Sequence, residues 1–105
     1  MSLVVVNVAK DFSRFPAGRF RRHGKYSGEV FREQFLIPAV TKKQRLLVEL
    51  DGTLGYGSSF LEEAFGGLMR VTGAAPEDVM TLIQLKSDDT SLVQEIQDYI
   101  RHGAE

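Results

Sequence analysis

Residues able to bind an anion gather between positions 14 and 26, where basic and aromatic side chains alternate. Guanidinium groups beside aromatic rings can hold a phosphate, a single-stranded nucleic acid or an acidic protein patch. Arg19, Arg21 and Arg22 are the candidates for such contacts. The alternative is a loop whose aromatic rings enter the core while its charges face water. The net charge of −1 favours this alternative, because domains built for nucleic acid are usually basic overall.

A second group of reactive residues occupies positions 49–54, with the sequence ELDGTL. It differs by one residue from the D-x-D-G-T signature of the haloacid-dehalogenase phosphotransferases, in which the first aspartate is the nucleophile. Glu49 stands in that place here, and its longer side chain misses the in-line geometry that phosphoryl transfer requires. We therefore interpret Asp51 and Gly52 as a strand end followed by a turn. The phosphotransferase interpretation would instead predict a magnesium-dependent phosphatase activity that is lost on substitution of Asp51.

No other residue pattern predicts catalysis, a metal or a cofactor. His23 and His102 are far apart in the sequence, and neither a serine–histidine–acid set nor a glycine-rich phosphate loop with lysine is recognisable. The chain has no cysteine, which excludes disulfides, thiol catalysis and thiolate zinc sites. We predict no catalytic residue, no metal and no cofactor.

The elements that position these residues alternate between strands and helices. Apolar and β-branched runs predict strands, and apolar residues at helical spacing predict helices. The expected strands are 3–8, 45–50 and 80–86, and the expected helices are 28–37, 58 or 59 to 73, and 88 or 89 to 102. Residues 10–26 are expected to form a long loop, with a short strand around 19–21, and residues 74–78 a turn or short helical piece. This order predicts a single α/β domain over residues 1–105, with a small mixed or largely parallel sheet of three to four strands and about three helices packed on it.

Helix ends and glycines give further expectations. Ser27 is the expected N-cap of the first helix, which Pro38 should end. Ser59 has the capping-box spacing to Glu62 at the start of the second helix. Gly66 and Gly67 fall inside that helix, where each costs about 1 kcal/mol relative to alanine. Either close packing of another helix or a flat docking surface for a partner would explain them.

Charge is distributed unevenly along the chain. Residues 1–50 carry ten Lys or Arg against four Asp or Glu, hence +6, and residues 51–105 carry three against ten, hence −7. This asymmetry indicates either a basic face for an anionic partner or two surfaces that attract each other in the fold. No apolar run approaches the ~20 residues of a membrane helix, and the N-terminus lacks the charges of a signal peptide. We therefore expect a cytoplasmic protein with no membrane contact.

Two blocks of the sequence resemble the STAS-like family of unknown function, which consists of small bacterial domains. Residues 16–32 resemble that family's G-R-[YF]-R and G-x-x-S-G-E-x-F-R block. Residues 50–68 resemble its strand, loop, serine and S-F-x-x-E-x-F-G segment at a helix start. The resemblance implies the STAS fold of the anti-anti-sigma factors.

The strand-to-helix junction of those factors carries a D-S-S-G motif with a phosphorylatable serine. Gly57 to Phe60 occupies that place here, so the resemblance implies Ser59 as the phosphoacceptor, with Ser58 as the second candidate. Phe60 and Gly57 depart from the motif, and Glu62 and Glu63 would repel a phosphate at position 59. A helix cap without phosphorylation is therefore the alternative for Ser59.

The resemblance thus implies a non-catalytic regulatory domain that binds another protein, either as a plain binding module or with phosphorylation of a serine as a switch. The resemblance implies a kinase-type ATPase or an anti-sigma-like regulator as the partner. The expected partner-binding residues are Gly55, Tyr56, Gly57, Phe60, Glu63, Gly66 and Gly67. The alternative is a nucleic-acid or nucleotide-binding module that uses the basic loop 14–26, and its binding would weaken steeply with salt.

Overall fold

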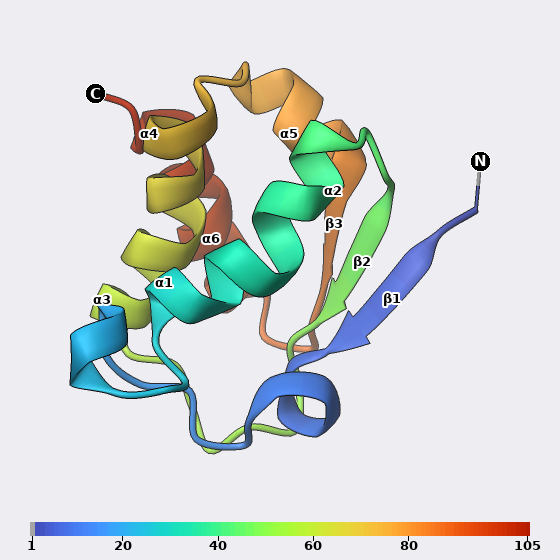
Figure 1. Ribbon diagram of the computed structural model, residues 1–105. Coiled ribbons are helices and arrows are strands. Elements are labelled where there is room, and N and C mark those ends of the chain that lie inside the picture. The colour runs from blue at the N-terminus through green and yellow to red at the C-terminus, as the bar shows by residue number, and fades with distance from the viewer. Residues whose placement is uncertain (1) are drawn as a thin grey trace.

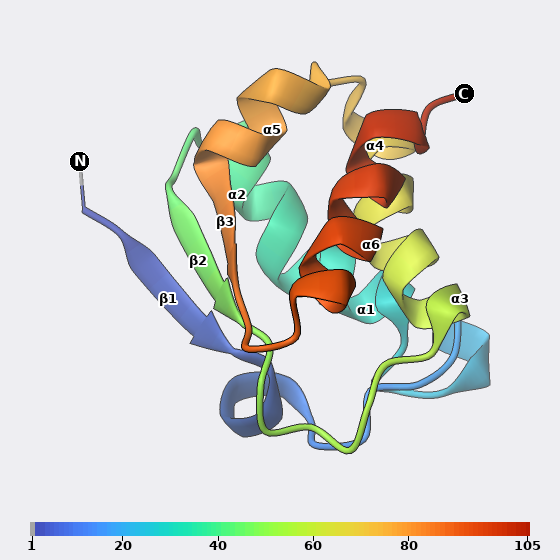
Figure 2. The same cartoon turned by 180° about the vertical axis from the view of Figure 1, so that it is seen from behind.

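The sheet has three strands, all parallel, and the helices gather on one side of it (Figures 1 and 2). The computed structural model describes residues 2–105. Strand β1 (Val4–Asn7) lies at one edge, β2 (Leu46–Glu49) lies in the centre and β3 (Ile83–Lys86) lies at the other edge. The α/β class and the small, largely parallel sheet predicted from the sequence are confirmed.

Two long helical segments lie on the helical side of this sheet, and each contains a π-helical turn. The first joins α1 (Gly28–Phe31), the turn Arg32–Leu36 and α2 (Ile37–Thr41). The second joins α3 (Ser58–Leu61), the turn Glu62–Gly66 and α4 (Gly67–Thr72). The remaining helical elements are the π-helical turn Val8–Phe12, the 3-10 turn Arg21–His23, α5 (Pro76–Leu82) and α6 (Thr90–His102).

Local side-chain chemistry explains where several helices begin and end. Ser27 Oγ accepts the N–H of Val30 at 3.3 Å, which confirms the predicted N-cap of α1. Asp89 Oδ1 accepts the N–H of Leu92 at 3.1 Å and caps α6 in the same way. Gly73 ends α4 in the left-handed conformation with φ 67°, which glycine adopts at little cost.

The structure corrects two expectations about prolines and strands. Pro38 does not end the first helix, because the π-helical turn before it shifts the backbone pairing and places Pro38 at the start of α2, where its missing N–H is tolerated. The predicted strand 80–86 is wrong in its first half. Pro76 and the acidic residues after it start a helix that runs through Leu82, so β3 contains only Ile83–Lys86.

The expected loop 10–26 is also more structured than its composition suggests. Asn7 Oδ1 accepts the N–H of Lys10 at 3.0 Å, so the chain turns into a helical turn at Val8 and the first strand ends early. No strand forms around residues 19–21 in the described chain. Instead His23 Nδ1 accepts the N–H of Phe20 at 3.1 Å and supports a 3-10 turn.

The core lies between the helices and the inner face of the sheet. Phe31 and Phe60 are buried where α1 and α3 meet, and Phe12 packs edge-on to Phe31 with ring centroids 5.1 Å apart. Gly28 permits this approach, since a Cβ there would lie 2.4 Å from the backbone oxygen of Phe60. These contacts fix the start of α3 relative to the loop before α1. No helix within residues 2–105 is long and apolar enough to cross a membrane.

Candidate functional site

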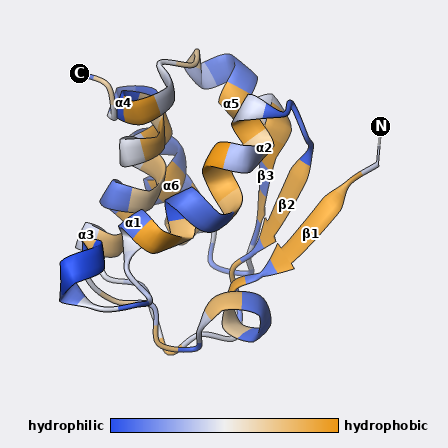
Figure 3. Ribbon diagram, in the orientation of Figure 1, coloured by the Kyte–Doolittle hydropathy of each residue, from blue (hydrophilic) through white to orange (hydrophobic). Residues whose placement is uncertain are grey.

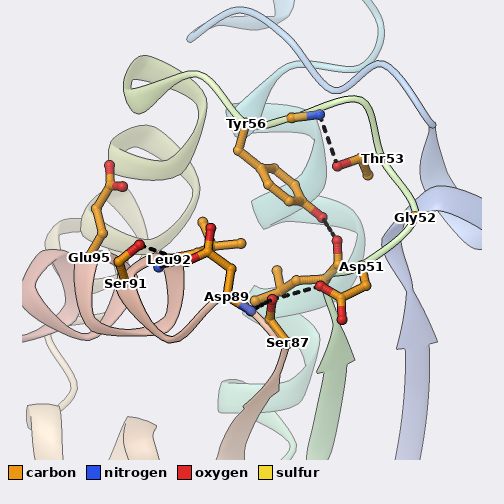
Figure 4. Close-up of a pocket in the computed structure, with 11 residues that line it drawn as sticks. Asp51, Gly52, Thr53, Tyr56, Ser87, Asp89, Ser91, Leu92 and Glu95 are labelled. Carbon is orange, nitrogen blue, oxygen red and sulfur yellow. Dashed lines mark hydrogen bonds between the residues drawn. The ribbon is translucent and has the colours of Figure 1, made fainter.

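A crevice of about 300 Å³ opens at the carboxyl ends of β2 and β3 (Figure 4). Ligands of open parallel sheets bind outside the carboxyl ends of the strands, so this crevice is a candidate site by position. The loop after β2 forms one wall and the start of α6 forms the other. Its lining residues are Leu50, Asp51, Gly52, Thr53, Gly55, Tyr56, Ser87, Asp89, Ser91, Leu92 and Glu95.

Asp51 ties the two walls of the crevice together. Its carboxylate accepts the hydroxyl of Ser87 at 2.6 Å and the N–H of Asp88 at 3.0 Å. These two hydrogen bonds hold the pKa of Asp51 below its usual range. Gly52 follows with φ 105° in a turn, which confirms the interpretation of this pair as a strand end followed by a turn.

Tyr56 fixes the far end of the loop after β2. Its hydroxyl donates to the carbonyl of Leu50 at 2.6 Å, and its ring lies 6.0 Å from that of Phe60. Burial raises the pKa of Tyr56 to about 12. Gly55 and Gly57, on either side of it, are exposed. The loop is therefore held at both ends while its middle faces solvent.

Ser58 and Ser59 form the first turn of α3 and are exposed. The predicted cap at Ser59 is wrong, because the helix begins earlier, with Gly57 at the N-cap and no side chain to accept a hydrogen bond there. Among residues 2–105, neither serine hydroxyl has a hydrogen-bond partner. Both hydroxyls are thus accessible from solvent.

Three arginines surround the two glutamates of the next turn. Arg19 Nη1 lies 2.5 Å from Glu62 and 3.2 Å from Glu63, and Arg70 Nη1 lies 2.7 Å from Glu62. Arg32 Nη1 lies 2.6 Å from Glu63, and both of these side chains are buried. Hydrogen bonds from Arg70 and then Arg19 hold the pKa of Glu62 below its usual range. The negative charge expected to repel a phosphate at Ser59 is therefore balanced by cations.

A comparison with known protein families identifies the family to which the chain belongs. The model of a STAS-like domain of unknown function matches residues 27–91, more than half of the chain. The chain belongs to this family. The match begins at the N-cap of α1 and ends in the first turn of α6, so it includes both serines and all the crevice residues except Leu92 and Glu95. No curated protein and no solved structure matches the chain.

The three arginines predicted to bind anions in this STAS-like domain have different surroundings. Arg19 pairs with the glutamates of the second long helix, and Arg21 pairs with Glu33. Arg22 lies over the ring of Phe20, 4.8 Å from its centroid, and has no carboxylate within ion-pair distance in the described part of the chain. Opposite charges from the two halves of the sequence thus meet inside the fold, and anion binding by these arginines stays a prediction.

The residues predicted to bind a partner divide into exposed and buried groups. Gly55 and Gly57 are exposed and Tyr56 is half-buried. In this STAS-like domain the fold encloses the others, which are Phe60, Glu63, Gly66 and Gly67. A Cβ at Gly67 would lie 2.2 Å from Arg32 Nη1, and the backbone of Gly66 contacts Gly103. Close packing therefore explains the two helical glycines, and the accessible part of the surface is the loop.

Two exposed apolar side chains lie beside this loop: Leu54, which was not singled out from the sequence, and Phe15, whose ring does not enter the core as the alternative for the basic loop expected. Leu54 is 72% exposed and Phe15 is 63% exposed. The N–H of Leu54 donates to the carbonyl of Arg14 at 3.0 Å, so the two segments lie side by side. The exposure of Leu54 could have been predicted from its place between Gly52 and Gly55, in a loop too short to bury a leucine. Within residues 2–105, no group of three or more acidic, histidine or cysteine side chains is arranged to hold a metal ion.

Proposed function

We propose that this STAS-like domain is a non-catalytic regulatory module that binds another protein through a serine surface. The serine surface consists of Leu54, Gly55, Gly57, Ser58 and Ser59. The observation that carries the proposal is the pair of exposed serine hydroxyls, without hydrogen-bond partners in the described chain, at the start of a long helical segment. Ser59, or Ser58 in its place, accepts a phosphate that releases the partner.

The electrostatics of the second long helix support a phosphate at this place. Backbone N–H groups at a helix start and its partial positive charge suit an anion. Glu62 and Glu63 do not oppose it strongly, because Arg19, Arg32 and Arg70 surround them. A modified serine would add a charge of about −1.5 to −2 to a surface that also contains the exposed apolar side chain of Leu54. Such a charge disfavours an interface that buries apolar surface, which gives the release.

The partner proposed for this surface is a protein of a bacterial signalling pathway. A kinase-type ATPase or an anti-sigma-like regulator would both bind the unmodified domain and supply the phosphate. Exposed Leu54 and Phe15 would provide the apolar contacts at the centre of the interface. The cytoplasm is the proposed location.

The test is a capture experiment with intact-mass measurement. Wild type, Ser59→Ala and Ser59→Glu are immobilised and exposed to a bacterial lysate depleted of ATP, and their intact masses are recorded after a second incubation with ATP added. Thr90→Glu serves as the matched control, because Thr90 is an exposed residue in the first turn of a different helix, α6. We expect one protein captured without ATP by wild type, Ser59→Ala and Thr90→Glu but not by Ser59→Glu. After ATP is added, we expect an added mass of one phosphate on wild type and Thr90→Glu and on neither Ser59 variant. Ser58 variants repeat the design if the phosphate stays on Ser59→Ala.

If no phosphate is added and nucleic acid co-purifies, the basic loop 14–26 becomes the better candidate for the interface. Unmodified mass together with nucleic acid that co-purifies would contradict the serine switch. Binding that weakens steeply with salt and on Arg21→Ala and Arg22→Ala substitution would then assign the loop 14–26 as the interface. If Ser59→Glu and wild type capture the same amount of the protein, the domain binds a partner but a charge at Ser59 does not control the binding.

A further inference from the structure

The outer edge of β1 is open along a run of apolar residues. β1 lies at the end of the strand order, so one side pairs with β2 and nothing within residues 2–105 pairs with the other. Leu3, Val4 and Val5 are 41%, 46% and 50% exposed, and Figure 3 shows β1 as a hydrophobic strand at the margin of the sheet. Such edges pair with other strands unless charges, prolines or bulges block them. Residues 4–7 contain neither a charge nor a proline.

Backbone groups at the centre of this edge point away from β2. The N–H of Val4 donates to the carbonyl of Arg45 at 3.0 Å, so Val4 faces β2. Successive residues of a strand alternate in the side to which their backbone groups point, so the N–H and C=O of Val5 face outward. At the end of the strand the N–H of Asn7 donates to Asp11 Oδ2 at 2.7 Å. Val5 therefore offers one donor and one acceptor at the middle of the edge.

The side chains of β1 offer apolar contacts on both faces of the sheet. Val4 lines a hollow of about 290 Å³ with Phe35 and Pro38 on the helical side. Val5 points to the other face, where its register neighbour is Leu47 and where Figures 1 and 2 show no helix. Parallel sheets are normally covered by helices on both faces, whereas here only one face is covered. An added strand would gain hydrogen bonds and apolar contacts together.

We propose that the added strand is β1 of a second copy of this chain, paired antiparallel across a twofold axis at Val5. Val5 then faces Val5 of the other copy and exchanges two N–H···O hydrogen bonds with it. Val4 faces Val6, while the Asp11 carboxylate keeps the N–H of Asn7 out of the pairing. The three strands of each copy join in one continuous sheet. The serine surface takes no part in this contact, so the inference is independent of the proposed function.

Charge at the two ends of β1 favours the antiparallel arrangement. Lys42 lines the hollow beside Val4 at the start of the strand, and Asp11 lies at its end. Antiparallel pairing brings Lys42 of one copy to the end that carries Asp11 of the other, which is electrostatically complementary. A twofold contact of this kind also closes at two copies, whereas a contact between β1 and β3 would propagate into a fibre.

The strength of this contact follows from its size. A four-residue edge buries less than the roughly 1,200 Å² of stable protein complexes. We therefore expect a reversible dimer with a dissociation constant on the order of 10 to 100 µM. Analytical ultracentrifugation of the full chain between about 10 µM and about 1 mM covers this range.

The sharpest variant is Val5→Pro. Proline removes the N–H at the twofold axis, and an edge strand tolerates proline where the N–H faces outward, so the pairing of β1 with β2 is preserved. Val5→Lys is the second variant, and Val71→Lys is its matched control, because Val71 is a similarly exposed valine on α4 at 59%. We expect wild type and Val71→Lys to dimerise alike, and both Val5 variants to raise the dissociation constant at least about tenfold.

Cross-linking tests the register independently of stability. The chain has no cysteine, so Val5→Cys carries a single thiol, and a short bis-maleimide should join two copies of it. Val71→Cys should give only monomer with the same reagent. A wild type that stays monomeric to about 1 mM, an assembly that grows beyond two copies, or a dimer unchanged by both Val5 variants would each overturn the proposal. Far-UV circular dichroism identifies any variant that fails to fold. If Val5→Pro or Val5→Lys does not fold, the cross-linking of Val5→Cys tests the dimer instead.

Discussion

Two consecutive turns of the second long helix contrast in how their polar groups are used. In the first turn, Ser58 and Ser59 are exposed and have no hydrogen-bond partners within residues 2–105. In the next turn, Glu62 and Glu63 contact three arginines, of which Arg70 lies further along the same segment and Arg19 and Arg32 come from other parts of the chain. The glutamates therefore stabilise the fold, whereas the serine hydroxyls are accessible to a ligand or a modifying enzyme. The sequence alone presents both turns as polar and does not distinguish them.

The largest expected effect comes from breaking the buried pair of the second turn. Glu63→Gln removes the charge opposite Arg32, which is only 7% exposed and would then be a buried cation without its closest counter-charge. Removing one partner of a buried ion pair costs about 3 to 5 kcal/mol. We expect the free energy of unfolding in urea to fall by about 3 kcal/mol.

Glu33→Gln is the control for that measurement, because Glu33 pairs with Arg21 at the surface. Exposed ion pairs contribute between about 0 and 1 kcal/mol, so this variant should unfold nearly as the wild type does. Equal effects of the two substitutions would mean that burial does not distinguish the two pairs.

Gly67→Ala should have the next largest effect. The added Cβ would lie 2.2 Å from Arg32 Nη1 and 3.0 Å from Glu63 Oε2, so the buried pair must move. Overpacking of this kind costs about 1 to 3 kcal/mol. Gly57→Ala is the matched control, since nothing lies within 4 Å of its added Cβ and its φ of −72° suits alanine. Thermal unfolding should show a clear loss for Gly67→Ala and almost none for Gly57→Ala.

Acid should weaken the second turn by a smaller amount. The pKa of Glu62 in the folded protein lies below its ordinary value of about 4.5, mainly because Arg70 donates a hydrogen bond to its carboxylate. Its contribution is therefore present above about pH 4.5 and is lost as the pH falls through the folded pKa. Because the pair is partly solvated, the contribution should stay below about 1 kcal/mol. Urea unfolding of wild type and Glu62→Gln should differ at pH 6 and converge toward pH 3, and a constant difference would contradict this assignment.

The smallest expected effect is in the first turn. Ser59→Ala and Ser58→Ala remove hydroxyls that have no partner in the described chain, so each should change the free energy of unfolding by less than about 0.5 kcal/mol. Loss of a true cap would cost about 1 kcal/mol. Ser27→Ala provides the comparison, because Ser27 does cap α1 and should show that loss. A cost for Ser59→Ala equal to that for Ser27→Ala would restore the capping interpretation.

Sequence patterns were sufficient for the parallel sheet and for the helix ends that depend on local chemistry. Ser27, Asp89 and Gly73 act within a few residues of themselves, so their roles can be read from spacing. The prediction at Pro38 was wrong because proline is also tolerated in the first turn of a helix, and no sequence pattern marked the π-helical turn that precedes it. The helical piece expected within 74–78 is present, but α5 continues to Leu82, so the loose alternation in 80–86 marks a strand only from Ile83 onward.

The sequence predicted where the loop after β2 and its two serines lie, but not which of the neighbouring residues are exposed. The loop after β2 and the two serines follow from the order of strand, glycine-containing loop and helix. Which residues are accessible there depends on tertiary contacts: Phe60 and Gly67 are enclosed, while Leu54 is not. Arg19 was expected to be available for an external anion, yet it contacts glutamates 43 and 44 residues away. Pairings across such separations require the fold.

The ends of the described chain lie away from the crevice and the serine turn, as both ribbon views show (Figures 1 and 2). Gly103 is also anchored, because its carbonyl accepts a hydrogen bond from Arg70 at 2.9 Å. A tether attached at residue 105 would therefore hold the protein in a defined orientation, with the serines directed away from the support. Sensor surfaces and single-molecule tethers built this way should present the loop after β2 to solution without a linker.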